Sequence, residues 1–245
     1  MSFQLLRSVP SFQLGSVRLF CIPCAGGSAS FYDGWIASTP RWLQVCPVEL
    51  PGRGWLGSEP LPTSLNKLAQ AISSALYPYT GVPYAIFGHS MGALLAYEVA
   101  SHLESSGRLQ LCRLFVSGSR APFMPRKEPP VSELPDAEFV EHIRNMQGTS
   151  DEIFAQPELI EFLLPVLRSD FALCEQYRLQ HAYFLKAPLT ALSGEQDKDT
   201  PESDMEMWGR LTTGGFRSLR FAGGHFFLKG NESAVIGALC SELGR

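Results

Sequence analysis

A serine stands between two glycines in the segment YAIFGHSMGALLAYEVA, residues 84–100, and its surroundings favour a nucleophile. This serine, Ser90, follows the apolar run Tyr84–Gly88 and opens a run with helical spacing. A sharp strand-to-helix turn would hold the hydroxyl clear of the sheet, and Gly88 and Gly92 would allow that turn. G-x-S-x-G alone also describes a tight turn with an incidental serine. Its place between a strand and a helix favours the nucleophile.

The hydroxyl would need a base to remove its proton, and one of the five histidines is placed for that task. His225 follows the apolar run SLRF through Ala222 and two glycines, so we expect it at the carboxyl end of the last strand. Open α/β sheets place their sites at that edge, and the chain order nucleophile, acid, histidine requires a late histidine. The other histidines lie beside the serine, in the helix after it, or in an irregular central segment (His89, His102, His142 and His181).

An acid that orients the histidine should lie between the two in the chain, again just beyond a strand. The segment LTALSGEQDKD, residues 189–199, offers the carboxylates Glu195, Asp197 and Asp199. Asp197 stands three residues beyond Gly194, far enough past the strand to turn back toward a histidine loop. Glu195 is too close to the strand end, which leaves Asp199 as the nearest competitor. Asp197 would hold one imidazole tautomer and stabilise the imidazolium without taking the proton.

The oxyanion formed during acyl transfer needs hydrogen-bond donors. The backbone N–H of Met91, the residue after the serine, would supply one. The second should come from the loop Pro23–Gly27 after the first strand, where two glycines let the backbone approach closely, and we expect Ala25 N–H to be that donor. Dinucleotide-binding domains also carry a glycine-rich loop after a strand, but this loop lacks their G-x-G-x-x-G spacing.

Short apolar runs alternate with helical patterns over most of the chain, which predicts an α/β fold with a mostly parallel central sheet and helices on both faces. The expected strands are Val17–Ile22, Leu43–Glu49, Tyr84–Gly88, Leu111–Ser117, Leu189–Leu192 and Ser218–Phe221. The expected helices include Ser64–Leu76, Ser90–Ser105 and Ser233–Leu243. Met91, Leu95, Val99 and Leu103 recur every fourth residue in the second helix and should form one buried stripe.

The alternation fails between about residues 121 and 186, where we expect a helical lid insertion within a single domain of residues 1–245. After a proline-rich loop, Asp136 is expected to cap one helix. A second helix should begin at Pro157, and Pro165 should kink or restart it. Long insertions in compact domains often form active-site lids. A helical subdomain that only stabilises the fold is the alternative.

The composition of the chain is that of a globular protein, with 45% hydrophobic and 18% charged residues. The net charge of −4 predicts no surface for nucleic acid. The sequence has no apolar run long enough for a membrane span and no signal-peptide pattern at its start, so we expect a cytoplasmic protein without membrane contact. Cys21 and Cys24 match C-x-x-C, but Cys21 falls in a predicted strand, which disfavours a redox or zinc pair.

Several motifs together resemble the type II thioesterases associated with polyketide synthases and nonribosomal peptide synthetases. They are IPCAGG with Phe31-Tyr32 after it, LPGRG at 50–54, GHSMGA at 88–93, SGSRAP at 117–122, LRSDF at 167–171, GEQD at 194–197 and GGHFFL at 223–228. LPGRG and GGHFFL, in this order around GHSMG, are much more specific than the serine motif alone, and the likeness runs almost end to end. Cys24 departs from the family, in which that position often holds another residue such as histidine.

The resemblance implies an α/β-hydrolase fold, the triad Ser90, Asp197 and His225, and oxyanion donors at Ala25 and Met91. It implies that the protein hydrolyses acyl groups from the phosphopantetheine arm of carrier proteins and so clears stalled or mis-primed synthases. The enzyme would need no metal or cofactor of its own, act as a monomer, and meet acyl or peptidyl carrier domains. The candidate walls of its acyl pocket are apolar residues of the insertion: Phe154, Leu159, Phe162, Leu163, Leu167 and Phe171.

Two other functions could use the same residues. A carboxylesterase or lipase on this scaffold would hydrolyse small oxygen esters, and a non-catalytic module would only bind acyl chains or carriers. The complete triad argues against the binding module. Because carrier proteins are usually acidic, four cations near the predicted site are candidate contacts, with ordinary solvated loop charges as the alternative. These cations are Arg53, Arg120, Arg126 and Lys127.

Overall fold

The structure is a computed structural model that describes residues 4–126, 129–146, 148 and 156–244. Six strands form one parallel sheet in the order β2-β1-β3-β4-β5-β6. The strands are β1 (Val17–Ile22), β2 (Leu43–Pro47), β3 (Tyr84–His89), β4 (Leu111–Ser117), β5 (Leu189–Gly194) and β6 (Phe216–Phe221). The strand order reverses between β1 and β3, and the carboxyl ends of the strands at such a reversal are where open α/β sheets bind ligands.

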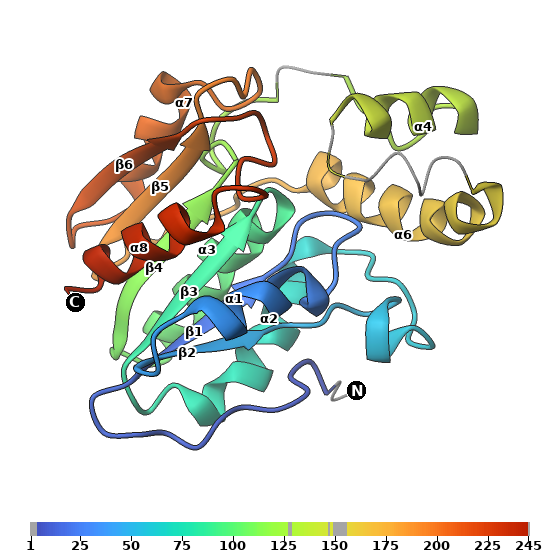
Figure 1. The fold of residues 1–245 in the computed structure, drawn as a ribbon. Coiled ribbons are helices and arrows are strands. Elements are labelled where there is room, and N and C mark those ends of the chain that lie inside the picture. Colours follow the sequence, from blue (N-terminus) through green and yellow to red (C-terminus); the bar gives the residue numbers. More distant parts are fainter. Residues whose placement is uncertain (1–3, 127–128, 147, 149–155, 245) are drawn as a thin grey trace.

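Helices cover both faces of this sheet (Figure 1). On one face α2 (Leu65–Leu76) and α3 (Met91–Ser105) pack side by side, and on the other lie α1 (Asp33–Ser38) and α8 (Glu232–Glu242). A separate apolar core fills the space between the sheet and each helical layer. This arrangement confirms the predicted α/β fold class. Strands covered by helices on both faces are buried on both faces, which is why they read as continuous apolar runs in the sequence.

The six predicted strands and three predicted helices are all present, each ending within two residues of its expected bounds. The short helices α1 and α7 (Glu202–Glu206) were not expected, since five or six residues are too few to display a helical repeat. Within the described residues, no helix combines the length and the apolar character that a membrane crossing needs.

The insertion between β4 and β5 contains α4 (Asp136–Asn145) and α6 (Pro157–Gln176), which lie together beyond one end of the sheet (Figure 1). Pro157 begins α6 as predicted, but the helix does not restart at Pro165 and runs unbroken for 20 residues. The prediction that Asp136 caps α4 is wrong. The cap position is Pro135, and the Asp136 carboxylate instead accepts a hydrogen bond from Arg168 of α6 at 2.6 Å. This ion pair joins the two helices of the insertion.

Candidate active site

Ser90 occupies a strained turn between β3 and α3. Its φ of 56° and ψ of −118° make it the one non-glycine residue with positive φ among those the structure describes. A Cβ on Gly88 would collide with the carbonyl oxygen of Gly92, and a Cβ on Gly92 would collide with that of Ile22. Glycine is therefore required on both sides of the serine. Strain of this kind persists where the surrounding structure enforces it, often at functional sites.

The turn is fixed by its neighbours and points the first turn of α3 at the serine. The Ser90 N–H donates to the Ser117 carbonyl at the end of β4, at 2.7 Å, and the Ala93 N–H donates to the Ser90 carbonyl at 2.9 Å. The unpaired N–H groups of a helix N-terminus carry partial positive charge. Negative charge that develops on the carbonyl oxygen of a group attacked by Ser90 would therefore be stabilised here.

His225 and Asp197 meet as the sequence predicts. His225 Nδ1 lies 2.9 Å from Asp197 Oδ2, and both side chains are almost fully buried. His225 Nε2 is also buried and has no hydrogen-bond partner in the described part of the chain. An imidazole held at Nδ1 by a carboxylate keeps Nε2 free to accept a proton from a hydroxyl. Within the described residues Ser90 and His225 do not form a hydrogen bond; in enzymes of this kind that contact shortens when the substrate binds.

The loops that carry this pair contact one another through their backbones. The Gln196 N–H donates to the Gly223 carbonyl at 2.9 Å. A Cβ on Gly194 would collide with the carbonyl oxygens of Gly223 and Gly224, so the end of β5 can approach the histidine loop only because it is glycine. The glycines in GEQD and GGHFFL thus bring acid and histidine together.

The Asp197 carboxylate is held ionised by a cluster of donors. Burial would raise its pKa, but hydrogen bonds from His225, the Thr200 hydroxyl and the Asp199 N–H outweigh burial and lower it. Thr200 Oγ1 donates to Oδ2 at 2.7 Å, the same oxygen that faces His225. The sequence analysis missed Thr200. Asp199, the competing acid, instead offers its backbone N–H to Asp197 Oδ1 at 3.0 Å.

His89, which immediately precedes Ser90 in the chain, lies in the protein interior. Its ring is fully buried, with Nδ1 3.0 Å from the Ser117 hydroxyl and its centroid 5.2 Å from that of His225. Burial, followed by repulsion from His225, lowers the pKa of His89 well below its usual 6.5. Because the His89 ring is buried and neutral, it packs against the neighbouring side chains, and His225 remains the candidate base.

The loop after β1 lies against the first turn of α3, where an oxyanion would form. Of its backbone donors, Gly26 N–H donates to Asp170 at 2.8 Å and Gly27 N–H to the Cys24 carbonyl at 3.0 Å. These two N–H groups are engaged within the protein, so they do not compete with the predicted donor of this loop, Ala25 N–H. Ala25 and Met91 line the same cavity as Ser90 and His225.

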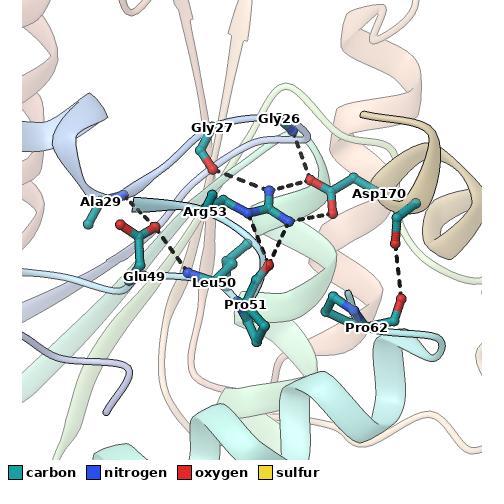
Figure 2. A network of polar contacts seen from close by, with 10 residues as sticks. Gly26, Gly27, Ala29, Glu49, Leu50, Pro51, Arg53, Pro62 and Asp170 are labelled. Atoms are coloured by element: carbon teal, nitrogen blue, oxygen red, sulfur yellow. Dashed lines mark hydrogen bonds and ion pairs between the residues drawn. The ribbon is translucent and has the colours of Figure 1, made fainter. Parts of the chain in front are cut away.

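A buried ion pair connects helix α6 of the insertion to this loop, as Figure 2 shows. The Arg53 guanidinium pairs with both carboxylate oxygens of Asp170, one contact measuring 2.8 Å, while Asp170 Oδ2 also accepts from Gly26 N–H. Arg53 donates further to the carbonyls of Gly27 and Pro51. The sequence motifs LPGRG and LRSDF contain both residues but give no signal that they meet, because 117 positions separate them.

The segment Gly52–Gly57 reads GRGWLG and so matches the letters G-x-G-x-x-G of a nucleotide loop. It opens no long helix: residues Gly54–Leu56 within it form a short 3-10 turn, and the next helix, α2, starts only at Leu65. A Cβ on Gly54 would collide with the Glu49 carboxylate, while Arg53 is engaged by Asp170. These glycines accommodate neighbouring side chains, and the structural context of a pyrophosphate site is missing.

A cavity of about 380 Å³ is lined by Ser90 and by residues of the insertion. Of the predicted pocket walls, Leu163, Leu167 and Phe171 line it. The prediction is wrong for Phe162 and Leu159, which are 71% and 40% exposed and do not line the cavity. Phe154 lies outside the described residues. Sequence reasoning missed many lining residues, among them four from the loop after β4 and the C-terminal end of α6: Met124, Val131, Cys174 and Tyr177.

Two of the four candidate cations are not available to a carrier protein. Arg53 is 7% exposed and engaged by Asp170, and Arg120 pairs with Asp204 at 2.8 Å. Arg126 lines the cavity, and Lys127 lies outside the described residues. The expectation of exposed loop charges is therefore wrong for the first two.

The cysteines of the C-x-x-C segment are free and buried. Burial raises the pKa of the Cys24 thiol to about 11, so this residue, which lines the cavity, stays a thiol at neutral pH. In the part of the chain that the structure describes, no group of three or more His, Cys, Asp or Glu side chains could hold a metal ion.

Known proteins share both the sequence pattern and this fold. Residues 17–243 match the thioesterase domain family. The linear gramicidin dehydrogenase LgrE of Brevibacillus parabrevis is 38% identical, over 93% of this chain and 88% of its own. The gramicidin S biosynthesis protein GrsT of Aneurinibacillus migulanus is 34% identical, over 93% and 89%. The type II thioesterase BorB from the borrelidin biosynthetic cluster superposes with a TM-score of 0.89 at 34% identity, covering 99% of each chain. The chain belongs to the thioesterase family.

Proposed function

We propose that Ser90, His225 and Asp197 form a catalytic triad that hydrolyses acyl thioesters on the phosphopantetheine arm of carrier proteins. One observation carries the proposal. His225, anchored at Nδ1 by Asp197 at 2.9 Å, opens with the strained Ser90 into a single cavity beneath the lid. Membership of the thioesterase family indicates that the bond broken is a thioester. The cavity supplies the environment for an apolar acyl group.

In the first half-reaction His225 Nε2 takes the Ser90 proton while the serine oxygen attacks the thioester carbonyl. The resulting oxyanion accepts hydrogen bonds from Met91 N–H and Ala25 N–H, and each such donor is worth about 3–4 kcal/mol of barrier. The intermediate then collapses, the carbon–sulfur bond breaks, and the departing sulfur takes the proton from His225. Free pantetheine thiol leaves, and the acyl group stays on Ser90 as an ester.

The second half-reaction repeats these steps with water. His225 removes a proton from a water molecule, whose oxygen attacks the acyl-serine carbonyl. The same two N–H groups hold the new oxyanion, and collapse returns the proton to the Ser90 oxygen. The products are a carboxylic acid and the free enzyme. Asp197 stays ionised throughout, because Thr200 and the Asp199 N–H bind its carboxylate as well as His225.

The biological setting we propose is the clearing of stalled or mis-primed synthases of polyketides or nonribosomal peptides. Similar proteins carry names from gramicidin and borrelidin biosynthesis. The acyl group would arrive on a carrier domain, and the enzyme would need no cofactor of its own, act in the cytoplasm and act as a monomer. One relative is named a dehydrogenase. In this chain Gly54 packs against the Glu49 carboxylate and Gly52 against the Leu61 side chain, on either side of the ion-paired Arg53, so we propose no nucleotide cofactor.

The test compares hydrolysis of one acyl group presented as a carrier-bound thioester and as an oxygen ester. The wild-type enzyme should hydrolyse the thioester, with kcat/KM at least tenfold above that for the ester. Ser90→Ala should abolish turnover and labelling by a fluorophosphonate. Ser119→Ala, which changes another serine lining the cavity, should retain both.

Retained turnover in Ser90→Ala would contradict the triad. A preference for the oxygen ester would instead favour a carboxylesterase on the same scaffold. The editing role has its own assay, in which a synthase blocked by acylated carriers is treated with enzyme. Wild type should restore product formation and Ser90→Ala should not.

A further inference from the structure

The cavity has an inner arm that runs from Ser90 along two helices. On α3 the lining continues from Ser90 and Met91 to Leu94, one turn further on. On α6 it continues from Leu167 through Phe171 and Cys174 to Tyr177, at spacings of four, three and three residues. These spacings place the α6 residues on one face of that helix. We call the space between Ser90 and Tyr177 the inner arm.

On both helices, the residues that line the inner arm begin next to the reaction centre. Ser90 is the residue before α3. Leu167 of α6 contacts the loop that carries the expected oxyanion donor, since a Cβ on Gly26 would collide with the Leu167 side chain. Asp170, one turn on, accepts the Gly26 N–H. The distance along either helix therefore indicates how far an acyl chain can extend from the reacting carbonyl.

The two helices are joined at the far end of the arm. The Tyr177 hydroxyl, at the C-terminal cap of α6, donates to Glu98 Oε1 of α3 at 2.5 Å. Burial, and then the adjacent Glu98 carboxylate, raise the pKa of Tyr177, so the hydroxyl keeps its proton and remains the donor. Beside this contact Glu175 holds the loop after β4, accepting from Val131 N–H at 2.7 Å. Val131 and Tyr177 both line the cavity, so both of these contacts hold residues of its wall in place.

We infer that Tyr177 is the end wall of the acyl site and limits the substrate to medium-chain acyl groups. This inference rests on the proposed function and names its substrate class. Its role is that of a specificity-determining residue: the ring blocks the arm, and the hydrogen bond to Glu98 fixes where the ring stands.

The length of the arm follows from helix geometry. Glu98 lies eight residues beyond Ser90, or about 12 Å along α3, and Tyr177 lies ten residues beyond Leu167, or about 15 Å along α6. Contact with the wall takes about 3.5–4 Å, leaving roughly 8–11 Å for the chain. An extended chain advances about 1.2 Å per bond, so about seven to nine bonds fit. The best acyl groups should have about eight to ten carbons.

The experiment measures kcat/KM for pantetheine thioesters of straight-chain acids from two to sixteen carbons. For the wild type we expect a maximum at eight to ten carbons and a value at least tenfold lower at fourteen. Tyr177→Ala should open the end, so that the ratio of the fourteen-carbon to the eight-carbon value rises at least tenfold. Cys174→Phe fills the arm partway along and should lower the ratio of the eight-carbon to the four-carbon value at least tenfold.

Phe162→Ala is the matched control, since Phe162 lies on the same helix but is exposed and outside the cavity. Its ratios should stay within threefold of wild type. A wild-type profile without a fall, or variants of Tyr177 and Cys174 that fold by circular dichroism yet keep the wild-type ratios, would overturn the inference. Both outcomes leave the proposed function intact. Absence of Ser90-dependent turnover at every chain length would contradict the function itself.

Discussion

Replacing Asp170 by alanine should destabilise the protein by about 3–5 kcal/mol, the cost of removing one partner from a buried ion pair. Asp170 is fully buried and Arg53 is 7% exposed, so the guanidinium would keep its charge without solvent or a counterion. The substitution also removes the acceptor of the Gly26 N–H. Arg53 would retain hydrogen bonds of 3.3–3.4 Å to backbone carbonyls, which are too long to replace the lost carboxylate.

Urea unfolding followed by tryptophan fluorescence measures this loss. Domains are stable by about 5–15 kcal/mol, so the variant should lose roughly a fifth or more of the total, with a lower midpoint. A domain of this size loses about 2–4 °C of Tm per kcal/mol, which predicts a drop of roughly 10 °C. Arg53→Met combined with Asp170→Leu should recover part of the loss, because two apolar side chains leave no buried charge.

Asp136→Ala is the control. It breaks the Arg168–Asp136 ion pair, which also involves α6, but the Asp136 side chain in that pair is 75% exposed. Exposed pairs contribute below about 1 kcal/mol. Losses of similar size in Asp136→Ala and Asp170→Ala would refute the reasoning, because burial could not then be the cause. A double variant less stable than Asp170→Ala would refute it too.

Three further predictions follow from the site. Thr200→Val should lower kcat about tenfold at unchanged KM in steady-state assays, because Asp197 loses one hydrogen bond to a charged group, worth about 1.5–3 kcal/mol. His89 has a folded pKa well below 6.5, so it contributes stability that is lost as pH falls below that value, by up to about 1.4 kcal/mol per pH unit. His89→Gln should flatten this slope in urea unfolding between pH 5 and 6.5, and an unchanged slope would contradict it. Gly92→Ala should lower kcat/KM at least tenfold, since its Cβ would collide with the Ile22 carbonyl; activity near wild type would show that the turn can adjust.

The sequence predicts the sheet and the chemistry at its edge for one physical reason. Parallel strands bury both faces, so their apolar runs are easy to find, and functional loops follow their carboxyl ends. Ser90, Asp197 and His225 all stand just beyond such a run, and the structure brings the acid and the histidine within 2.9 Å. Local pattern and overall topology agree at these positions.

The insertion between β4 and β5 is less predictable because its contacts join distant segments. Phe162 and Leu163 are adjacent and equally apolar, yet a helix turns about 100° per residue, and only Leu163 faces the cavity. Arg53 has the setting of a solvated loop charge, and only the fold shows that Asp170 buries it. Tyr177 carries no motif. Its role becomes visible through the contact with Glu98, 79 positions away.

The most direct test of the account is the identity of the residue that carries the acyl group during turnover. Enzyme quenched in acid while hydrolysing an octanoyl-pantetheine thioester should gain the mass of one octanoyl group. Peptide mass spectrometry should place it on Ser90, and His225→Ala should show no such adduct. Steady turnover without an adduct, or an adduct on any other residue, would contradict the central claim that Ser90 is the nucleophile of this thioesterase.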